Sequence, residues 1–137
     1  MNRRDFIIVS CASAGAIAAG GCALGPGVSG PPDSVSLTLK VSDYPALANV
    51  NGVAFVTENG GTGLAVVRTG SASFLALSRI CPHQGGQIDQ GGPAKFQCTR
   101  HGAEFDVDGN WVGGQPTSNM RSYPTSYDAS TDTLVIG

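Results

Sequence analysis

The sequence predicts an all-β domain built from short antiparallel strands. Three observations favour this fold class: 20 Gly and 8 Pro among 137 residues, several short apolar segments bounded by turn residues, and no sustained helical period after residue 32. An apolar fraction of 41% with only 13% charged residues excludes a disordered chain. A net charge of −2, with 8 Lys and Arg, excludes the basic surface that nucleic acid requires.

The expected strands follow one another with Gly, Asn or Asp turns between them. Residues 35–41 alternate apolar and polar side chains, as a half-buried strand does. Asp108-Gly109-Asn110 is a strong hairpin signal, and Trp111 behind it is expected in the core. The strands expected from these patterns are 35–41, 53–56, 64–68, 74–78, 96–98, 103–107, 111–112, 121–127 and 133–136.

The first 22 residues are interpreted as an export address. Arg3-Arg4 precedes an uncharged run, Phe6 to Leu24, and the pair resembles a twin-arginine signal. Because a bilayer span needs about 20 apolar residues, residues 1–22 could also remain as an N-terminal anchor. The resulting expectation is a protein on the periplasmic side of the cytoplasmic membrane, tethered there or soluble after cleavage.

Two further features lie between this signal and the domain. Ala19-Gly20-Gly21-Cys22 resembles a lipoprotein cleavage box, with Cys22 as the lipidated residue; the alternative is that Cys22 is an ordinary small residue of the apolar run. Residues 23–34 are rich in Gly and Pro and predict a linker. The domain is therefore expected over residues 35–137.

Chemistry is concentrated in two short clusters. Cys81-Pro82-His83 and Cys98-Thr99-Arg100-His101 are separated by fourteen residues, and they hold every Cys and His after residue 22. Four such side chains could bind a tetrahedral zinc ion or an iron–sulfur cluster. Zinc modules usually place Cys with Cys and His with His, whereas each cluster here is mixed. This order favours a two-iron cluster with one iron bound by Cys and the other by His.

Cys-x-His, a gap in the mid-teens and Cys-x-x-His-Gly resemble the signature of Rieske [2Fe–2S] proteins. The resemblance is close from Ile80 to Asp106 and looser over the rest of the β domain. It implies a Rieske-type antiparallel β sandwich of small sheets, with two cluster-binding loops at one end. It implies one [2Fe–2S] cluster per subunit, with Cys81 and Cys98 on the inner iron and His83 and His101 on the outer iron.

Glycines and one arginine near these ligands allow two interpretations each. Gly85, Gly86 and Gly102 could let backbone N–H groups approach the sulfurs, or could be plain turn residues. Gly113-Gly114-Gln115-Pro116 resembles the loop that covers the cluster in the family, or is a surface turn. Arg100 could favour the reduced cluster and help to dock an acidic partner, or be a solvated side chain.

The chain departs from Rieske subunits of cytochrome bc-type complexes. The extra Cys pair that forms a disulfide in those subunits corresponds to Gly86 and Arg100, and their Ser and Tyr hydroxyl donors correspond to Ala103 and Phe105. Ala103 to Asp106 resembles instead the ferredoxin-type Rieske proteins that serve oxygenases. Two missing donors predict a potential in the lower half of the Rieske range of about −150 to +300 mV.

The resulting function is one-electron transfer rather than complete catalysis, because no nucleophile–base pair is visible and both His are used on the cluster. The favoured interpretation is an exported, membrane-tethered carrier or small subunit of a larger oxidoreductase, with a cytochrome or a larger subunit as redox partner. The alternatives are the quinol-oxidising subunit of a bc-type complex and a zinc-stabilised binding module.

Overall fold

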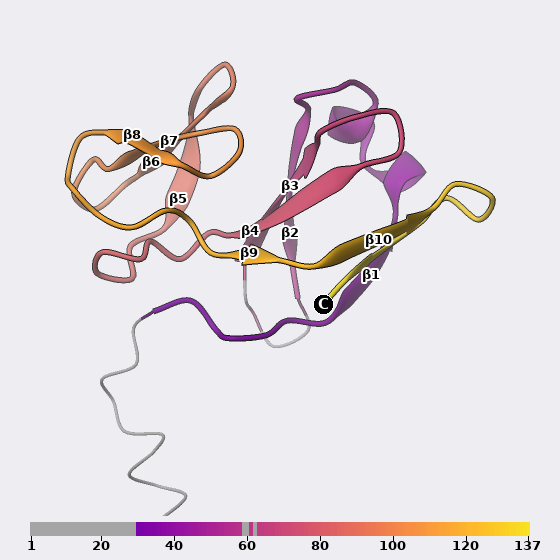
Figure 1. Cartoon of the computed structure of the whole chain (residues 1–137), viewed down its shortest axis with the longest axis horizontal. Coiled ribbons are helices and arrows are strands. Elements are labelled where there is room, and N and C mark those ends of the chain that lie inside the picture. Colours follow the sequence, from indigo (N-terminus) through magenta and orange to yellow (C-terminus); the bar gives the residue numbers. More distant parts are fainter. Residues whose placement is uncertain (1–29, 59–60, 62) are drawn as a thin grey trace, which may run out of the picture.

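The computed structural model describes residues 30–58, 61 and 63–137. The signal and anchor interpretation of residues 1–22, Cys22 and most of the linker lie outside the described residues. Eleven strands form three antiparallel sheets (Figure 1), so the all-β expectation is confirmed. Within the described residues, no helix is long and apolar enough to cross a membrane.

The first sheet has the strand order β1-β11-β10. It joins the two ends of the described chain, since β1 pairs with β11 and Leu37 lies opposite Ile136. Two short 3₁₀ turns, Val41–Asp43 and Pro45–Leu47, lead from β1 to the second sheet. The strands of the first sheet are β1 (Leu37–Lys40), β10 (Thr125–Asp128) and β11 (Thr133–Ile136).

The second sheet, with the order β2-β3-β4-β9, is the scaffold of the domain. Its strands are β2 (Val53–Thr57), β3 (Gly63–Arg68), β4 (Phe74–Ser78) and β9 (Ser122–Tyr123). Successive residues of β3 enter two different cores: Leu64 and Val66 pack toward the first sheet, and Ala65 and Val67 toward the third. A strand buried on both faces explains the continuous apolar run at this point of the sequence.

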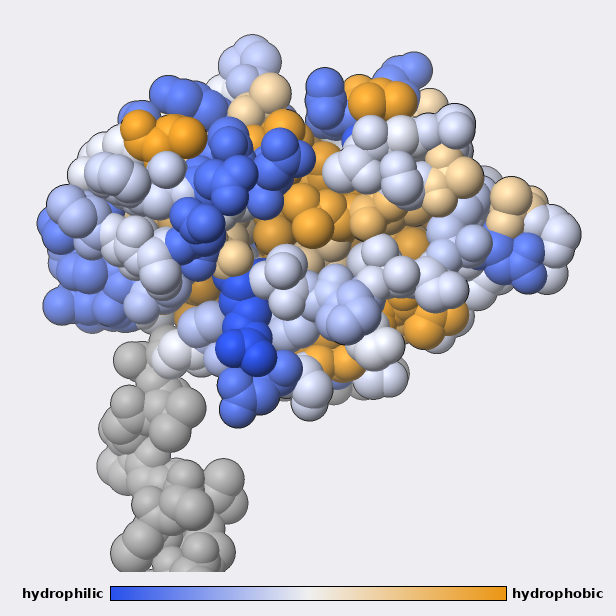
Figure 2. All heavy atoms as spheres, in the orientation of Figure 1, coloured by the Kyte–Doolittle hydropathy of each residue, from blue (hydrophilic) through white to orange (hydrophobic). Residues whose placement is uncertain are grey.

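The third sheet, with the order β5-β6-β7-β8, forms a separate lobe at the left of Figure 1. Its strands are β5 (Ile88–Gly92), β6 (Lys95–Cys98), β7 (Glu104–Asp106) and β8 (Trp111–Gly113). We call it the cluster sheet, because the two Cys/His loops flank β5 and β6. On the face seen in Figure 2, hydrophilic residues gather along the boundary between this lobe and the rest of the domain.

Two sequence expectations were wrong, and one strand was missed. Residues 121–127 do not form one strand, because Pro124 separates β9 from β10 and the two pair in different sheets. Trp111 is not in the core: it is 38% exposed on the edge strand β8. Strand β5 was not expected, since Ile88 is followed by Asp, Gln and Gly residues and the pairing with β6 shifts between Gln90 and Gly92.

Candidate metal centre

The two Cys/His loops lie side by side at one end of the cluster sheet. The first, residues 81–87, connects the scaffold to β5, and the second, residues 99–103, connects β6 to β7. Ile88 pairs with Cys98 in the β5–β6 ladder, which brings the end of the first loop to the start of the second. Antiparallel pairing of the strands therefore brings together four side chains that lie up to twenty positions apart in the sequence.

Both loops close with the same two hydrogen bonds, although their His residues follow the Cys at different spacings. In the first loop the Cys81 N–H donates to the Gly86 carbonyl (2.6 Å), and the Gly85 N–H donates back to the Cys81 carbonyl (2.9 Å). In the second loop Cys98 N–H donates to the Ala103 carbonyl (2.8 Å), and Gly102 N–H donates to the Cys98 carbonyl (3.0 Å). Each Cys thus sits at the base of a tight turn.

The two thiols form the inner part of this site. Cys81 and Cys98 are each 1% exposed, are not joined in a disulfide, and belong to the core between scaffold and cluster sheet. Burial raises the pKa of Cys81, and the neighbouring Cys98 side chain raises it further. Two backbone N–H groups act in the opposite direction, but the pKa stays above its usual value. Burial would also raise the pKa of Cys98, but four other effects lower it below its usual value. These are the backbone N–H groups of Arg100 and His101, the Cys81 side chain and the positive charge of Arg100.

The two imidazoles form the outer part. His83 is half-buried and His101 is exposed, and their rings meet edge to face with centroids 5.0 Å apart. The Nδ1 atom of His83 is buried and has no hydrogen-bond partner. A buried ring nitrogen without a partner is costly unless a ligand or metal takes it up, so this atom is open for coordination.

The four side chains are thus arranged as two pairs, thiol beside thiol and imidazole beside imidazole. Over the ranges that the structure describes, no three His, Cys, Asp or Glu side chains gather as a single metal ion would require. Two pairs of unlike donors suit a group with two metal atoms, one bound by sulfur and the other by nitrogen. The donor set therefore fits a two-iron cluster with mixed ligands.

Residues 38–124 match the family of the Rieske [2Fe-2S] domain. The chain belongs to this family. Its domain therefore binds a [2Fe–2S] cluster and takes part in iron–sulfur electron transfer, which favours iron over the zinc alternative. No curated protein sequence is similar enough to this chain to count as a match.

Two solved structures show the same fold. The plasma membrane Rieske protein PetC3 of the cyanobacterium Synechocystis PCC 6803 is 24% identical, with a TM-score of 0.58, over 74% of this chain and 98% of PetC3. The apo form of the quaternary ammonium Rieske monooxygenase CntA is 17% identical, with a TM-score of 0.60, over 76% of this chain. The match covers 33% of CntA, so this chain spans about a third of that monooxygenase.

The glycines near the ligands divide between the two interpretations. Gly85 and Gly102 are turn residues with positive φ (68° and 76°), and their N–H groups donate to carbonyls. Gly86 instead permits a close approach, because a Cβ there would lie 2.9 Å from the Cys98 sulfur. Gly114 packs against the second ligand loop, where a Cβ would lie 2.0 Å from the Gly102 carbonyl oxygen. The segment 113–116 therefore meets the second ligand loop at Gly114.

The residues at the departures from the bc-type pattern also lie at the site. Ala103 and Phe105 are fully buried in the same core as the two thiols.

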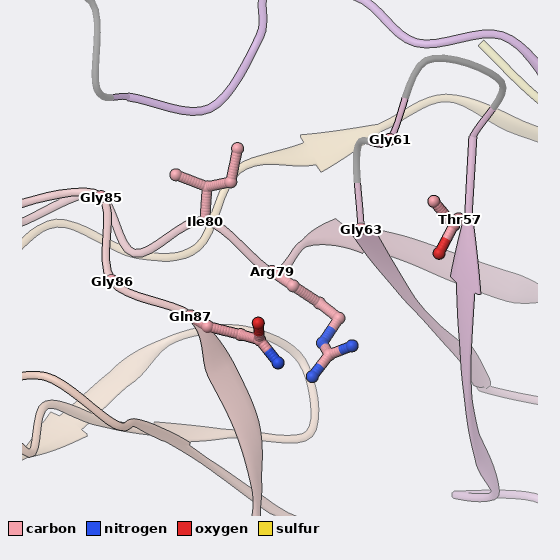
Figure 3. Close-up of a pocket in the computed structure, with 8 residues that line it drawn as sticks. All are labelled: Thr57, Gly61, Gly63, Arg79, Ile80, Gly85, Gly86 and Gln87. Carbon is pink, nitrogen blue, oxygen red and sulfur yellow. The ribbon is translucent and has the colours of Figure 1, made fainter.

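A cavity of about 300 Å³ lies beside the first loop (Figure 3). It is lined by Arg79, Ile80, Gly85, Gly86 and residues of the β2–β3 hairpin. Sequence reasoning missed Arg79, since one Arg two positions before a Cys carries no motif; only its contacts distinguish it.

Proposed function

We propose that Cys81, Cys98, His83 and His101 hold the [2Fe–2S] cluster, with the thiolates on one iron and the imidazoles on the other. One observation carries this assignment: the two Cys meet in the buried core, and the two His meet outside them with a buried Nδ1 left unpartnered. The cluster supplies a site that accepts and releases one electron.

The chain's own residues support that chemistry in three ways. Backbone N–H groups of His83 and Gln84 act to lower the pKa of Cys81, and those of Arg100 and His101 act to lower the pKa of Cys98, so both sets favour the thiolate. Such donors stabilise negative charge on the sulfurs. Burial of both thiols excludes water, while the exposed His101 offers a partner protein a short route for the electron.

We further propose that the protein works outside the cytoplasm as a tethered one-electron carrier, or as a small subunit of a larger oxidoreductase. Residues 1–22 would direct export or remain as an anchor, Cys22 would carry a lipid where the box is used, and residues 23–34 would separate the domain (35–137) from the membrane. PetC3, which shares the fold, is a plasma membrane Rieske protein, and this supports the proposal. A cytochrome or a larger oxidoreductase subunit would exchange the electron.

The quinol-oxidising subunit of a bc-type complex is the less favoured role. Its loop disulfide has no counterpart, because Gly86 and Arg100 stand at the two positions, and Ala103 and Phe105 lack the hydroxyls of its Ser and Tyr. A quinol-oxidation assay with candidate partner subunits, beside a measured midpoint potential, separates the two roles.

Iron and acid-labile sulfide analysis of the purified protein tests the ligand assignment. We expect equal amounts of iron and sulfide in the wild type, and loss of both with the visible absorption in Cys81→Ser and in His101→Ala. Thr99→Ala is the matched control, because Thr99 lies between two ligands without being one. A Cys81→Ser or His101→Ala protein with full colour and iron content would refute the assignment, and zinc in place of iron would restore the binding-module interpretation.

Export is tested separately with Arg3→Lys and Arg4→Lys together, which retain the charge but remove the twin-arginine signature. We expect the double variant to stay in the cytoplasm with its cluster, and Cys22→Ser to lose incorporation of labelled fatty acid. Normal export of the double variant would contradict the signal, and unlabelled wild-type protein would contradict lipidation.

A further inference from the structure

Arg79 joins the cluster sheet to the scaffold sheet, two residues before Cys81. Its guanidinium carbon lies 4.1 Å from the centre of the Phe55 ring on β2. Its Nε donates to the Ile88 carbonyl on β5 (2.9 Å), and its Nη2 forms a salt bridge with Asp89 of the same strand. In Figure 3 the side chain extends from the start of the first ligand loop toward the β2–β3 hairpin.

The backbone and stem of Arg79 make the same connection. Its N–H donates to the Gly63 carbonyl on β3 (3.0 Å), and its carbonyl accepts from the Ile88 N–H (2.7 Å). The stem also lies against Gly63, since a Cβ there would be in van der Waals contact, at 3.6 Å, with two Arg79 side-chain carbons. One residue therefore contacts three strands, β2, β3 and β5.

The position of Ile88 connects the Arg79 contacts to the second ligand loop. Ile88 is the residue of β5 that pairs with Cys98 on β6, and Arg79 holds Ile88 by both its N–H and its carbonyl. Arg79 thus lies two positions before Cys81 in the sequence, and it holds the β5 residue that pairs with Cys98. A displacement of its side chain would move the base of one ligand loop relative to the base of the other.

We propose that Arg79 is a positioning residue that keeps the two ligand loops in register by fixing both to the scaffold sheet. The Arg79 side chain is only 18% exposed, so its ion pair and its contact with the Phe55 ring are less screened than surface contacts. This proposal rests on the ligand assignment above.

Arg68 provides a matched control at the opposite end of β3. Its guanidinium lies 5.5 Å from the centre of the Phe74 ring and donates to the carbonyls of Leu47, Gly70 and Ser71. Arg68 and Arg79 therefore both place the guanidinium beside an aromatic ring of the scaffold sheet, and both donate from it to backbone carbonyl oxygen. None of the carbonyls that Arg68 reaches belongs to a ligand loop or to β5.

The test compares Arg79→Met and Arg68→Met in the purified holoprotein. Iron release to a chelator, the reduction potential, the electron paramagnetic resonance spectrum and urea unfolding are measured for both. We expect Arg79→Met to release iron about tenfold faster, as loss of a group that supports metal ligands does, with a changed spectrum and a shifted potential. Arg68→Met should lower the unfolding midpoint and leave spectrum and potential as in the wild type.

Arg79→Lys and Phe55→Leu complete the series. Lys keeps the charge opposite Asp89 but cannot reproduce the Nε bond to Ile88, so it should recover only part of the iron retention. If Arg79→Met does not fold, Phe55→Leu removes the ring beside the guanidinium, and with it the neighbour of the Phe96 ring, and should shift the spectrum in the same direction by less. Wild-type spectrum and potential in every Arg79 and Phe55 variant that folds would overturn the proposal, whereas a wild type without iron and sulfide would overturn the proposed function itself.

Discussion

Arg100 reaches from the second ligand loop to the first, where its Nη1 donates to the Gln84 carbonyl (3.0 Å). Its stem covers Gly86, because a Cβ at that glycine would lie 2.7 Å from the Arg100 Cβ. Gly86 and Arg100 are the two positions that correspond to the disulfide of bc-type Rieske subunits. They are spatial neighbours here, so a hydrogen bond and packing connect the loops where those subunits use a covalent bond.

Arg100→Met is expected to weaken this connection and to lower the reduction potential. The Met side chain can still cover Gly86, but the bond to Gln84 is lost, at a cost of about 1 kcal/mol, and so is the positive charge that favours the reduced cluster. Iron release to a chelator and protein-film voltammetry measure the two effects. Arg100→Lys keeps the charge and should retain the potential better; identical behaviour of Arg100→Met and wild type would show an ordinary solvated side chain.

Gly86→Ala is expected to cost the protein its cluster. The new methyl group would lie 2.9 Å from the Cys98 sulfur and closer still to Arg100, and buried Cys98 cannot move without displacing the ligand site. Gly102→Ala is the matched control: its φ of 76° strains Ala by about 1 kcal/mol, but no atom lies within 4 Å of the new Cβ. The iron and sulfide contents of the two purified variants test this prediction. A Gly86→Ala protein with as much cluster as Gly102→Ala would show that a methyl group at position 86 does not displace the Cys98 sulfur.

Much of the fold could be predicted from the sequence, because its strands carry local signals. Leu64 to Val67 reads as a buried strand, and Asp108-Gly109-Asn110 forms the expected hairpin, with the Gly109 N–H donating to the Asp106 carbonyl (3.0 Å). Trp111 was misplaced because an apolar residue after a hairpin is usually buried. The sequence does not show that β8 would be an edge strand, where the Trp111 Nε1 donates to the Gln115 carbonyl (3.0 Å).

The candidate site was predictable only in its ligand types. The Cys/His spacing named four residues, and the structure places all four at one end of the cluster sheet. The residues that hold the four ligands in place could not be predicted from neighbouring positions in the sequence. Arg79 depends on Phe55 and Asp89, which are 24 and 10 positions away in the sequence, and its contacts arise only when the scaffold and cluster sheets pack together.

The acid sensitivity of the first sheet should depend on Asp132. Hydrogen bonds from Ser42 and from the Tyr127 hydroxyl hold the pKa of Asp132 below its usual value, with the Ser42 contact the stronger cause. Because the folded pKa is below the unfolded one, this contribution is complete above the unfolded value of about 3.9 and is lost as the pH falls through the folded pKa.

Asp132→Asn should therefore reduce the free energy of unfolding at pH 7 and make it less dependent on pH between 4 and 2. Asn is the suitable replacement, since Asp132 has a φ of 54° and Asn tolerates that conformation. Urea unfolding at several pH values measures the free energy of unfolding of each variant. Asp43→Asn is the control, because the Asp43 carboxylate is exposed. Equal pH dependence in Asp132→Asn and wild type would show that Asp132 is not responsible.

The reduction potential of the wild type is expected in the lower half of the Rieske range of about −150 to +300 mV. Imidazole ligation raises the potential by removing negative charge, and hydrogen bonds to the sulfurs raise it further. Ala103 and Phe105 are fully buried in the core that contains both thiols, and neither side chain can donate such a bond. Arg100 is exposed, so solvent screens its compensating charge.

Ala103→Ser and Phe105→Tyr should each raise the potential, provided that the new hydroxyl meets a sulfur rather than another acceptor. Their burial beside Cys81 and Cys98 favours that outcome, because a buried hydroxyl without a partner is costly and the sulfurs share its core. Protein-film voltammetry on the wild type, both single variants and the double variant measures the shifts. Ala103→Val is a control for bulk, because it adds side-chain volume without a hydroxyl; an increase there equal to that in Ala103→Ser would point to packing. A wild-type potential already near the top of the range, and unmoved by both substitutions, would mean that backbone donors alone set it and would favour the quinol-oxidising role.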